Sequence, residues 1–383
     1  MGRGKISDHN DLDWLKLQSR QKLIFNNQPT LRTVDLFAGC GGLSLGVSEW
    51  CRRKGINHTC EFASEWDNEV LQIFINNLQP KHSSNQSILE ILDGKFNSKR
   101  LTKAEKKFLL THPSVIEPDL LTGGPPCQGH SDLNNHTRRG DERNNLYFSM
   151  VRAAYVLKPK SIIIENVSTV IHSKENVIQI SIQELEKMGY NVTQKTLKGV
   201  DFGVPQVRQR HFLIASKCGE PNFESIDQYS INSPRTLKWA IEDLKSLANN
   251  GELINSITKT TDENKFRMNW LVENDEYDLP NHLRPDCHKN GHTYPAVYGR
   301  MRWDQPSHTI TAGFTSNGQG RFTHPDAFPG RTITPHEAAR IQTFPDWFDF
   351  STSKRGTLKK AIGNAVPPLL AMYVAEVALN GCL

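Results

Sequence analysis

Apolar residues in the first part of the chain fall in short blocks that alternate with stretches of helical periodicity. The blocks are rich in β-branched and other large apolar residues, as buried strands are. They cover 33–37, 60–64, 119–121, 161–164, 192–197 and 212–215. Helical patterns lie between them, with the clearest at 146–157 and 177–188. Strands that alternate with helices predict an α/β fold built on a mostly parallel sheet.

The alternation stops near residue 217 and does not return until about residue 295. Asn, Asp, Glu, Lys and Ser dominate this stretch, and its length favours a small irregular domain over a loop. Later, the capping box Thr334-Pro-His-Glu337 predicts a helix, and an apolar helix is expected at 369–379. Residues 1–30 are polar apart from an amphipathic stretch at 14–17, and we interpret them as an N-terminal arm. The expected divisions are 1–30, 31–217, 218–295 and 296–383.

Composition narrows the class of protein. The 383 residues are 37% hydrophobic and 23% charged, which describes a soluble globular protein. No apolar run approaches the roughly 20 residues of a membrane span, and the first ten residues lack the apolar core of a signal peptide. Seven cysteines without Cys-x-x-Cys spacing suit a reducing compartment and argue against a disulfide scaffold. The net charge of +5 permits a nucleic-acid partner without requiring one.

A glycine-rich turn follows the first predicted strand. Gly39, Gly41 and Gly42 allow a ligand to approach the backbone, and the next helix offers free N–H groups at its start. Glu65 stands at the end of the second strand, where an acidic residue usually holds ribose hydroxyls. A solvated carboxylate is the alternative for Glu65. Together these features predict a nucleoside-binding site.

The segment 121–131, Leu-Thr-Gly-Gly-Pro-Pro-Cys-Gln-Gly-His-Ser, is the most unusual in the chain. Two prolines prevent the strand from continuing and place Cys127 on an irregular loop. Glu165 ends the neighbouring strand, so a thiol and a carboxyl are expected at the same sheet edge. Addition of the thiol to an electron-poor ring, with the acid protonating a ring nitrogen, uses both groups. A hydrolase in which His130 activates Cys127 is the alternative, but it leaves Glu65 without a role.

Six motifs, in order, resemble those of the cytosine carbon-5 DNA methyltransferases of bacterial restriction–modification systems. The resemblance covers about 33–217 and 296–380. The motifs are Asp35-Leu-Phe-Ala-Gly-Cys-Gly-Gly42, Gly124-Pro-Pro-Cys-Gln128, Glu165-Asn-Val167, Gln206-x-Arg208-x-Arg210, Arg302-x-Asp304-x-Pro306 with Thr309 and Thr311, and Gly363-Asn-Ala-Val-Pro-Pro368. The resemblance implies a Rossmann-like S-adenosylmethionine-dependent methyltransferase sheet with one antiparallel strand. It also implies that 218–295 is a target-recognition domain and that the last helix returns to the catalytic domain.

The resemblance further implies a mechanism and a set of site residues. Cys127 would add to carbon 6 of a flipped-out cytosine, and Glu165 would contact its ring, supported by Arg210 and Arg208. Methyl transfer from S-adenosylmethionine to carbon 5 and elimination would follow, leaving S-adenosylhomocysteine. The implied donor-binding residues are Phe37, Gly39, Gly41, Gly42, Glu65, Trp66, Ser87, Ile88, Pro126, Leu146, Asn364 and Val366.

The chain departs from the family pattern in two places. Ser87 stands where the family has an aspartate that takes the adenine amine, with Asp93 further along, and His130 replaces the usual phenylalanine. No metal is expected, because His282, Cys287, His288 and His292 match no paired metal motif.

The resemblance implies double-stranded DNA as the partner of a cytoplasmic, nucleoid-associated monomer. A restriction endonuclease of the same system would share its target without binding it directly. A tRNA cytosine-5 methyltransferase and a catalytically idle DNA-binding homologue are the alternatives. The length of 218–295 favours DNA over tRNA, and the presence of Cys127, Glu165 and Arg210 argues against an idle homologue.

Overall fold

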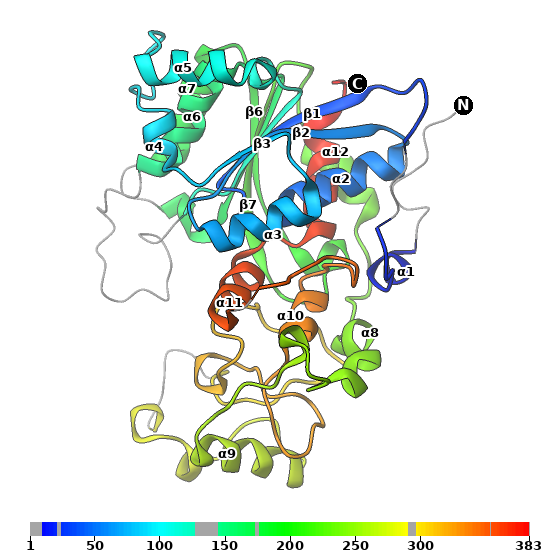
Figure 1. Cartoon of the computed structure of the whole chain (residues 1–383). Helices are drawn as coiled ribbons and strands as arrows, with labels where there is room; N and C mark the ends of the chain where they lie inside the picture. Colours follow the sequence, from blue (N-terminus) through cyan, green and yellow to red (C-terminus); the bar gives the residue numbers. More distant parts are fainter. Residues whose placement is uncertain are drawn as a thin grey trace.

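The computed structural model describes residues 10–20, 24–126, 145–172, 176–289, 296–352 and 354–382. Its centre is a seven-stranded sheet in the order β3-β2-β1-β4-β5-β7-β6 (Figure 1). The strands are β1 (Thr30–Leu36), β2 (Asn57–Ser64), β3 (His82–Ser84), β4 (Leu120–Gly123), β5 (Ser161–Val167), β6 (Asn191–Lys198) and β7 (Gln209–Ser216). Only β7 runs antiparallel to its neighbours β5 and β6. The predicted α/β fold with one antiparallel strand is confirmed.

Helices cover both faces of the sheet and extend below it. Those described are α1 (Asp11–Leu15), α2 (Gly42–Lys54), α3 (Asn68–Leu78), α4 (Ile88–Ile91), α5 (Lys103–Thr111), α6 (Asn145–Leu157), α7 (Val177–Lys187), α8 (Leu237–Ile241), α9 (Asp262–Glu273), α10 (Pro335–Ile341), α11 (Arg355–Asn364) and α12 (Pro368–Leu379). One apolar core contains residues of α2, α3 and α12, and a second contains residues of α4, α6 and α7. The sheet separates the two cores, as a doubly wound fold requires.

The helix ends follow local sequence signals. Thr102 with Glu105 and Thr334 with Glu337 form complete capping boxes at the starts of α5 and α10, and the second of these was predicted. Helix α10 ends at Ile341. The helix expected at 369–379 is α12, and a Cβ on Gly46 would lie 2.4 Å from the Ala371 Cβ. The missing side chain therefore lets α2 and α12 approach closely.

The described part of the segment after β7 contains only short helices and turns. It contains α8, α9 and several short 3₁₀ turns, which sequence periodicity did not reveal. Leu271, Leu279, Val297 and Tyr298 form a small core of their own, apart from the two cores of the sheet. The division at 218–295 stays a prediction, because Val297 and Tyr298 lie beyond it and Leu237 of α8 belongs to the core that contains α2 and α12. Figure 1 shows this region, with α9 in yellow-green, below the sheet and away from its strands.

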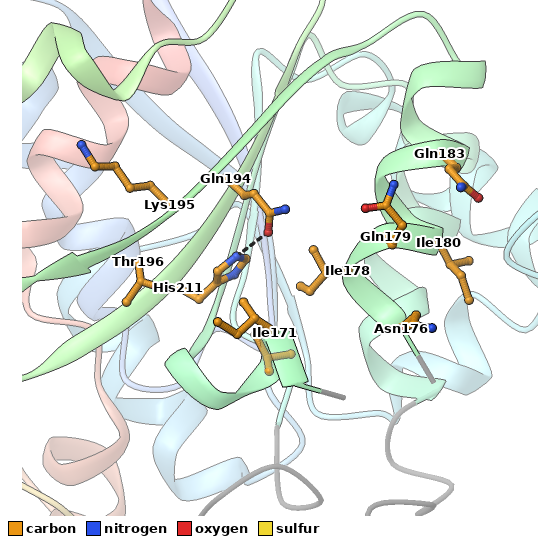
Figure 2. A pocket seen from close by; sticks show the side chains of 11 residues that line it. Ile171, Asn176, Ile178, Gln179, Ile180, Gln183, Gln194, Lys195, Thr196 and His211 are labelled. Carbon is orange, nitrogen blue, oxygen red and sulfur yellow. Dashed lines mark hydrogen bonds between the residues drawn. The ribbon is translucent and has the colours of Figure 1, made fainter. Parts of the chain in front are cut away.

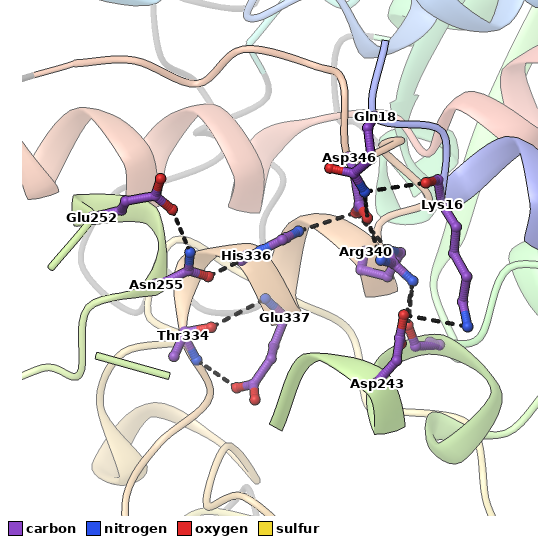
Figure 3. Close-up of polar contacts among 11 residues, drawn as sticks. Lys16, Gln18, Asp243, Glu252, Asn255, Thr334, His336, Glu337, Arg340 and Asp346 are labelled. Atoms are coloured by element: carbon purple, nitrogen blue, oxygen red, sulfur yellow. Dashed lines mark hydrogen bonds and ion pairs between the residues drawn. The ribbon is translucent and has the colours of Figure 1, made fainter. Parts of the chain in front are cut away.

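Polar side chains join the N-terminal residues to the lower part of the molecule (Figure 3). Asp346 accepts hydrogen bonds from Gln18 (3.0 Å) and from Arg340 (Nη2, 2.7 Å), and it contacts His336 Nε2 at 3.0 Å. Lys16 forms an ion pair with Asp243 at 3.2 Å. The described part of the predicted arm is therefore packed against the protein rather than extended into solvent.

Two cysteines form a disulfide, which the cysteine spacing did not predict. Cys218, just after β7, and Cys382, just after α12, are joined by a disulfide with their Cα atoms 5.0 Å apart. Sequence spacing missed this pair because the two residues are 164 positions apart and meet only when α12 packs beside β7. Cys40, Cys51 and Cys60 are buried free thiols, in line with the expectation that the chain has no disulfide scaffold.

Candidate active site

The glycine-rich turn after β1 has the left-handed backbone that its sequence suggested. Phe37 (φ 56°), Gly39 (φ 54°) and Gly41 (φ 98°) all have positive φ values. Glycine adopts this conformation freely, but for Phe37 it stores about 1–3 kcal/mol of strain, as is common at ligand sites. Helix α2 begins directly afterwards at Gly42. The turn thus presents backbone at the carboxyl end of β1.

Glu65 lies against this turn. Its Oε2 accepts the Gly39 N–H at 3.0 Å, and its Oε1 accepts the Asp67 N–H at 3.0 Å. Burial raises the pKa of Glu65, although these backbone hydrogen bonds oppose the change. The next residue, Trp66, is 74% exposed, which is unusual for so large an apolar side chain. A carboxylate beside an open indole ring fits a ribose joined to a flat base.

Residues near the C-terminus close the other side of the turn. A Cβ on Gly42 would lie 2.3 Å from the Val366 carbonyl oxygen, so only glycine fits there. Cys40 Sγ donates to the Ala361 carbonyl at 3.2 Å, just before the end of α11. Asn364 and Val366 are therefore brought to the first predicted donor motif from the opposite end of the chain. Leu146 and Phe37 pack against the same apolar core.

Ser87 and Ile88, which were predicted to line the adenine side of the donor pocket, follow β3. Ser87 caps α4 by accepting the Leu89 N–H at 3.3 Å, and Ile88 is buried. Asp93 accepts a hydrogen bond from the Thr102 hydroxyl. A cavity of about 390 Å³ opens at this sheet edge, and Asn85 and Gln86 line it. Glu65 N–H donates to the carbonyl of Ser84, another lining residue, at 3.2 Å, so the cavity adjoins the proposed ribose position.

Asp35 is buried behind the donor turn. The Ser44 hydroxyl donates to its Oδ2 at 2.5 Å. Burial raises the pKa of Asp35 to about 7, against the opposing hydrogen bonds from Ser44 and Thr122. In the folded protein this carboxyl therefore holds its proton over a pH range in which an unfolded aspartate is ionised.

Asp35→Asn is expected to stabilise the protein at pH 8 more than at pH 5. Because the folded-state pKa exceeds the unfolded one, stability contributed by protonated Asp35 is lost as the pH rises to about 7. The neutral amide avoids this loss. Roughly two pH units at 1.36 kcal/mol each predict a relative gain of about 2–3 kcal/mol, measured by urea unfolding. Exposed Asp13→Asn is the control, and an equal effect at both pH values would mean that Asp35 does not titrate there.

Glu65→Ala is expected to weaken binding of the methyl donor by about 1.5–3 kcal/mol, the scale of a hydrogen bond to a charged group. Loss of the Gly39 contact also frees the turn. Titration calorimetry with S-adenosylmethionine measures the change, and Glu90→Ala on the exposed side of α4 is the control. Unchanged affinity would remove Glu65 from the donor site.

A buried ion pair stands at the carboxyl end of β5. Glu165 is 8% exposed, and its Oε1 lies 2.8 Å from Arg210 Nε. The two meet because β5 and β7 are antiparallel, with Val167 opposite Arg210 and Glu165 opposite Phe212. Burial raises the pKa of Glu165, although the guanidinium groups of Arg210 and Arg208 act in the opposite direction. The raised pKa suits the carboxyl to acid catalysis.

Arg208 occupies a different position from Arg210. It is 1% exposed, and its Nη1 donates to the Ile310 carbonyl at 2.7 Å. Its Nη2 donates to the carbonyls of Gly363 (3.2 Å) and Asn364 (3.5 Å). These bonds join β7 to two C-terminal segments. The structure therefore gives Arg208 a positioning role and leaves Arg210 as the arginine that contacts Glu165.

The loop after β4 begins beside Glu165. A Cβ on Gly124 would lie 3.0 Å from Glu165 Oε2, and Asn166 Nδ2 donates to the Pro125 carbonyl at 3.2 Å. Pro126 is exposed and ends the described stretch. Cys127 and His130 lie outside the described residues, so their predicted roles rest on the sequence. The role of Asn166 in holding this loop was not predicted, although it belongs to the quoted Glu165 motif.

Another cavity is lined by a different set of residues. It measures about 870 Å³ and opens between α7 and the β6–β7 hairpin (Figure 2). His211 lines it, with Nε2 2.8 Å from Gln194 Oε1, and burial lowers the pKa of this histidine to about 4. None of the predicted catalytic or donor-binding residues lines this cavity. This cavity is therefore separate from the predicted site.

The described residues contain no group of three or more His, Cys, Asp or Glu side chains that could hold a metal ion. His292, one of the four residues considered earlier, lies outside them. Among the described helices, no single one is long and apolar enough to cross a membrane, and the bent pair α11–α12 passes by length and composition only.

Comparison with known proteins gives a consistent result. The sequence profile for C-5 cytosine-specific DNA methylases matches residues 31–380. The Type II methyltransferase M1.BsuMI of Bacillus subtilis is 41% identical over 367 residues, covering 95% of this chain and 84% of that protein. The Type II methyltransferase M1.HphI of Haemophilus parahaemolyticus is 31% identical over 362 residues, covering 92% and 87%.

Solved structures support the fold. The Dnmt2 methyltransferase of S. pombe has a TM-score of 0.60 at 18% identity, over 92% of this chain and 98% of that one. The Entamoeba histolytica methyltransferase EhMeth has a TM-score of 0.61 at 17% identity, over 92% and 99%. The family implies a methyl donor of the S-adenosylmethionine type and a DNA substrate. The chain belongs to the C-5 cytosine-specific DNA methylase family and is a DNA (cytosine-5)-methyltransferase.

Proposed function

We propose that this enzyme, as a monomer in the bacterial cytoplasm, methylates one cytosine within a short sequence of double-stranded DNA and so protects host DNA from an endonuclease of the same restriction–modification system. The buried Glu165–Arg210 pair beside the loop that leads to Cys127 is the observation that carries this proposal. It supplies an acid of raised pKa next to a fixed cation. A neutral ring with a basic nitrogen and a carbonyl oxygen, such as cytosine, fits both groups.

The chain's own groups divide the chemistry between them. Cys127 forms a bond to carbon 6 of the flipped-out base, while Glu165 provides a proton at ring nitrogen 3. Arg210 holds Glu165 and faces the base oxygen. Arg208 keeps β7 in register with the C-terminal segments through its three carbonyl contacts. Loss of the carbon-5 proton and elimination then release the Cys127 thiol.

We place the donor site at the same carboxyl edge of the sheet, next to the ends of β1 and β2. S-adenosylmethionine, when bound, supplies the methyl group that becomes attached to carbon 5. Phe37, Gly39, Gly41 and Gly42 would face its methionine and sugar, and Glu65 would hold the ribose hydroxyls. The remaining pocket residues would be Trp66, Ser87, Ile88, Pro126, Leu146, Asn364 and Val366. The strained turn, the exposed Trp66 and the Gly42–Val366 contact support this arrangement.

Bisulfite sequencing tests the proposal directly. DNA from cells that express the chain is compared with DNA from cells that carry an empty vector. One short motif with a single protected cytosine is the expected result, and purified enzyme should reproduce it with labelled donor. No protected cytosine in DNA would contradict the proposal, and protection found only in RNA would support the tRNA alternative.

A further inference from the structure

Three arginines surround one tyrosine in the region below the sheet. The guanidinium carbons of Arg302 and Arg300 lie 3.7 and 4.3 Å from the ring centroid of Tyr277. The Tyr277 carbonyl accepts the Arg300 N–H at 2.9 Å and Arg321 Nη1 at 2.7 Å. The tyrosine backbone is therefore fixed, and its ring is a rigid support for the arginine side chains.

Two of these arginines already have acceptors. Arg300 Nη2 lies 2.5 Å from Asp275 Oδ1, and its Nη1 donates to the Pro325 carbonyl at 3.1 Å. Arg321 forms an ion pair with Asp278. Arg302 makes no hydrogen bond or ion pair with any residue in the described part of the chain, and it is only half-buried. None of its five N–H donors is therefore used by a described residue, and a bound partner could accept hydrogen bonds from them.

The segment that carries Arg302 is tied to the catalytic strand region. Ser307 accepts the Val207 N–H at 2.8 Å, next to Arg208 and just before β7. The carbonyl of Trp303, adjacent to Arg302, accepts the Lys238 N–H at 3.0 Å. Arg302 is thus fixed in register with the strand that presents Arg210. A DNA base close to the target cytosine is the partner that this placement suits.

The stacked geometry favours a base over a phosphate. A guanidinium held 3.7 Å from the centre of an aromatic ring loses little side-chain entropy on binding, and its N–H groups form a planar fork of donors. Guanine presents two acceptors, O6 and N7, at the matching spacing in the major groove, and arginine is its commonest reader. A phosphate contact needs no such orientation, since flexible lysines and arginines supply it.

Resting on the proposed function, we propose that Arg302 reads a guanine within the recognition sequence and that Tyr277 is the positioning residue for it. Both residues lie outside the catalytic and donor-binding sets described above. The assignment depends on contacts between Tyr277 of the predicted target-recognition segment and arginines of the segment that follows it, and not on the chemistry of Cys127 or Glu165.

The test measures methylation rates of purified variants on short duplexes. One duplex carries the wild-type recognition sequence, and the others replace each of its guanines in turn. Arg302→Lys and Arg302→Ala are expected to lower the rate on the recognised sequence about 10- to 100-fold, the effect of one lost bidentate base contact. Discrimination should be lost at one guanine only. The slope of log affinity against log salt should stay at its wild-type value.

Matched variants distinguish a base contact by Arg302 from a purely structural role. Tyr277→Phe keeps the ring and should behave as wild type, whereas Tyr277→Leu should relax discrimination at the same guanine. Arg267→Lys is the control, because Arg267 also stacks on a tyrosine (5.7 Å) but donates to the Leu283 carbonyl and to Asn264. Thermal unfolding midpoints of the Arg302 variants should match wild type, since no described hydrogen bond is lost.

Each remaining outcome overturns the proposal in its own way. A uniform loss on every duplex, with a salt slope shallower by about one, would assign Arg302 to a phosphate. Wild-type rates and selectivity in the Arg302 variants would leave it as a solvated side chain. Absence of methylation by the wild-type enzyme would instead contradict the proposed function. Affinities of the wild type and the Arg302 variants for the same duplexes would still test whether Arg302 contacts a guanine.

Discussion

Cys127→Ser is expected to abolish DNA methylation while leaving the binding of donor and DNA intact. A serine hydroxyl has a much higher pKa than a thiol and is a far weaker nucleophile unless a general base activates it. The described residues next to the loop offer an acid in an ion pair, Glu165 with Arg210, and not a free base. Transfer of labelled methyl groups to the recognised duplex, together with calorimetric binding of each substrate, measures the change.

Cys287→Ser is the matched control for this experiment. Cys287 is an exposed free thiol in the predicted target-recognition segment, and its loss should leave the rate unchanged. Full activity in Cys127→Ser would exclude the covalent mechanism. A variant that lost donor binding as well would show that Cys127 is needed for the fold of the site.

Glu165→Gln is expected to lower kcat by about 10²- to 10⁴-fold, the usual contribution of a general acid. The amide keeps the size of the side chain and can still contact Arg210, but it cannot deliver a proton. Because burial raises the pKa of Glu165, wild-type activity should decline as the pH rises through that pKa. Single-turnover methylation across a pH series measures both effects, and the variant should lack this alkaline decline.

The same substitution at Glu186, exposed on α7, is the control for Glu165→Gln. The prediction concerns the chemical step, so affinity for the duplex should change less than about tenfold. A variant with wild-type kcat would contradict acid catalysis by Glu165. A large rise in the Kd for DNA with unchanged kcat would make it a binding residue instead.

The sheet could be predicted from sequence because its signals are local. Strands such as β5 are short apolar blocks, and the capping boxes of α5 and α10 lie within four residues. The strand β3, only three residues long and exposed or half-buried, has no such signal and was not recognised as a strand. The site at the carboxyl edge of the sheet stays a prediction, which rests on strand-end residues such as Glu65 and Glu165.

Features that depend on packing between distant segments were not predictable. Trp14 and Leu15 are buried because they belong to the apolar core that contains α2 and α12, although their surroundings in sequence are polar. Arg208 looked like a partner of Arg210, yet its donors go to carbonyls more than a hundred residues away. The Cys218–Cys382 disulfide was not predicted for the same reason, since its two residues are distant in sequence and meet only through tertiary packing. Sequence patterns identify the motif, and tertiary contacts decide what each side chain does.

The position of α12 has a consequence for synthesis on the ribosome. This helix packs on α2, the first helix of the sheet, and nearly all its side chains are buried. While the chain emerges N-terminal end first, the apolar faces of α2 and β5 remain uncovered until α12 has been made. The nascent enzyme therefore exposes apolar surface through most of translation. Its donor turn also lacks Val366 until then, so methylation should begin only with the finished chain.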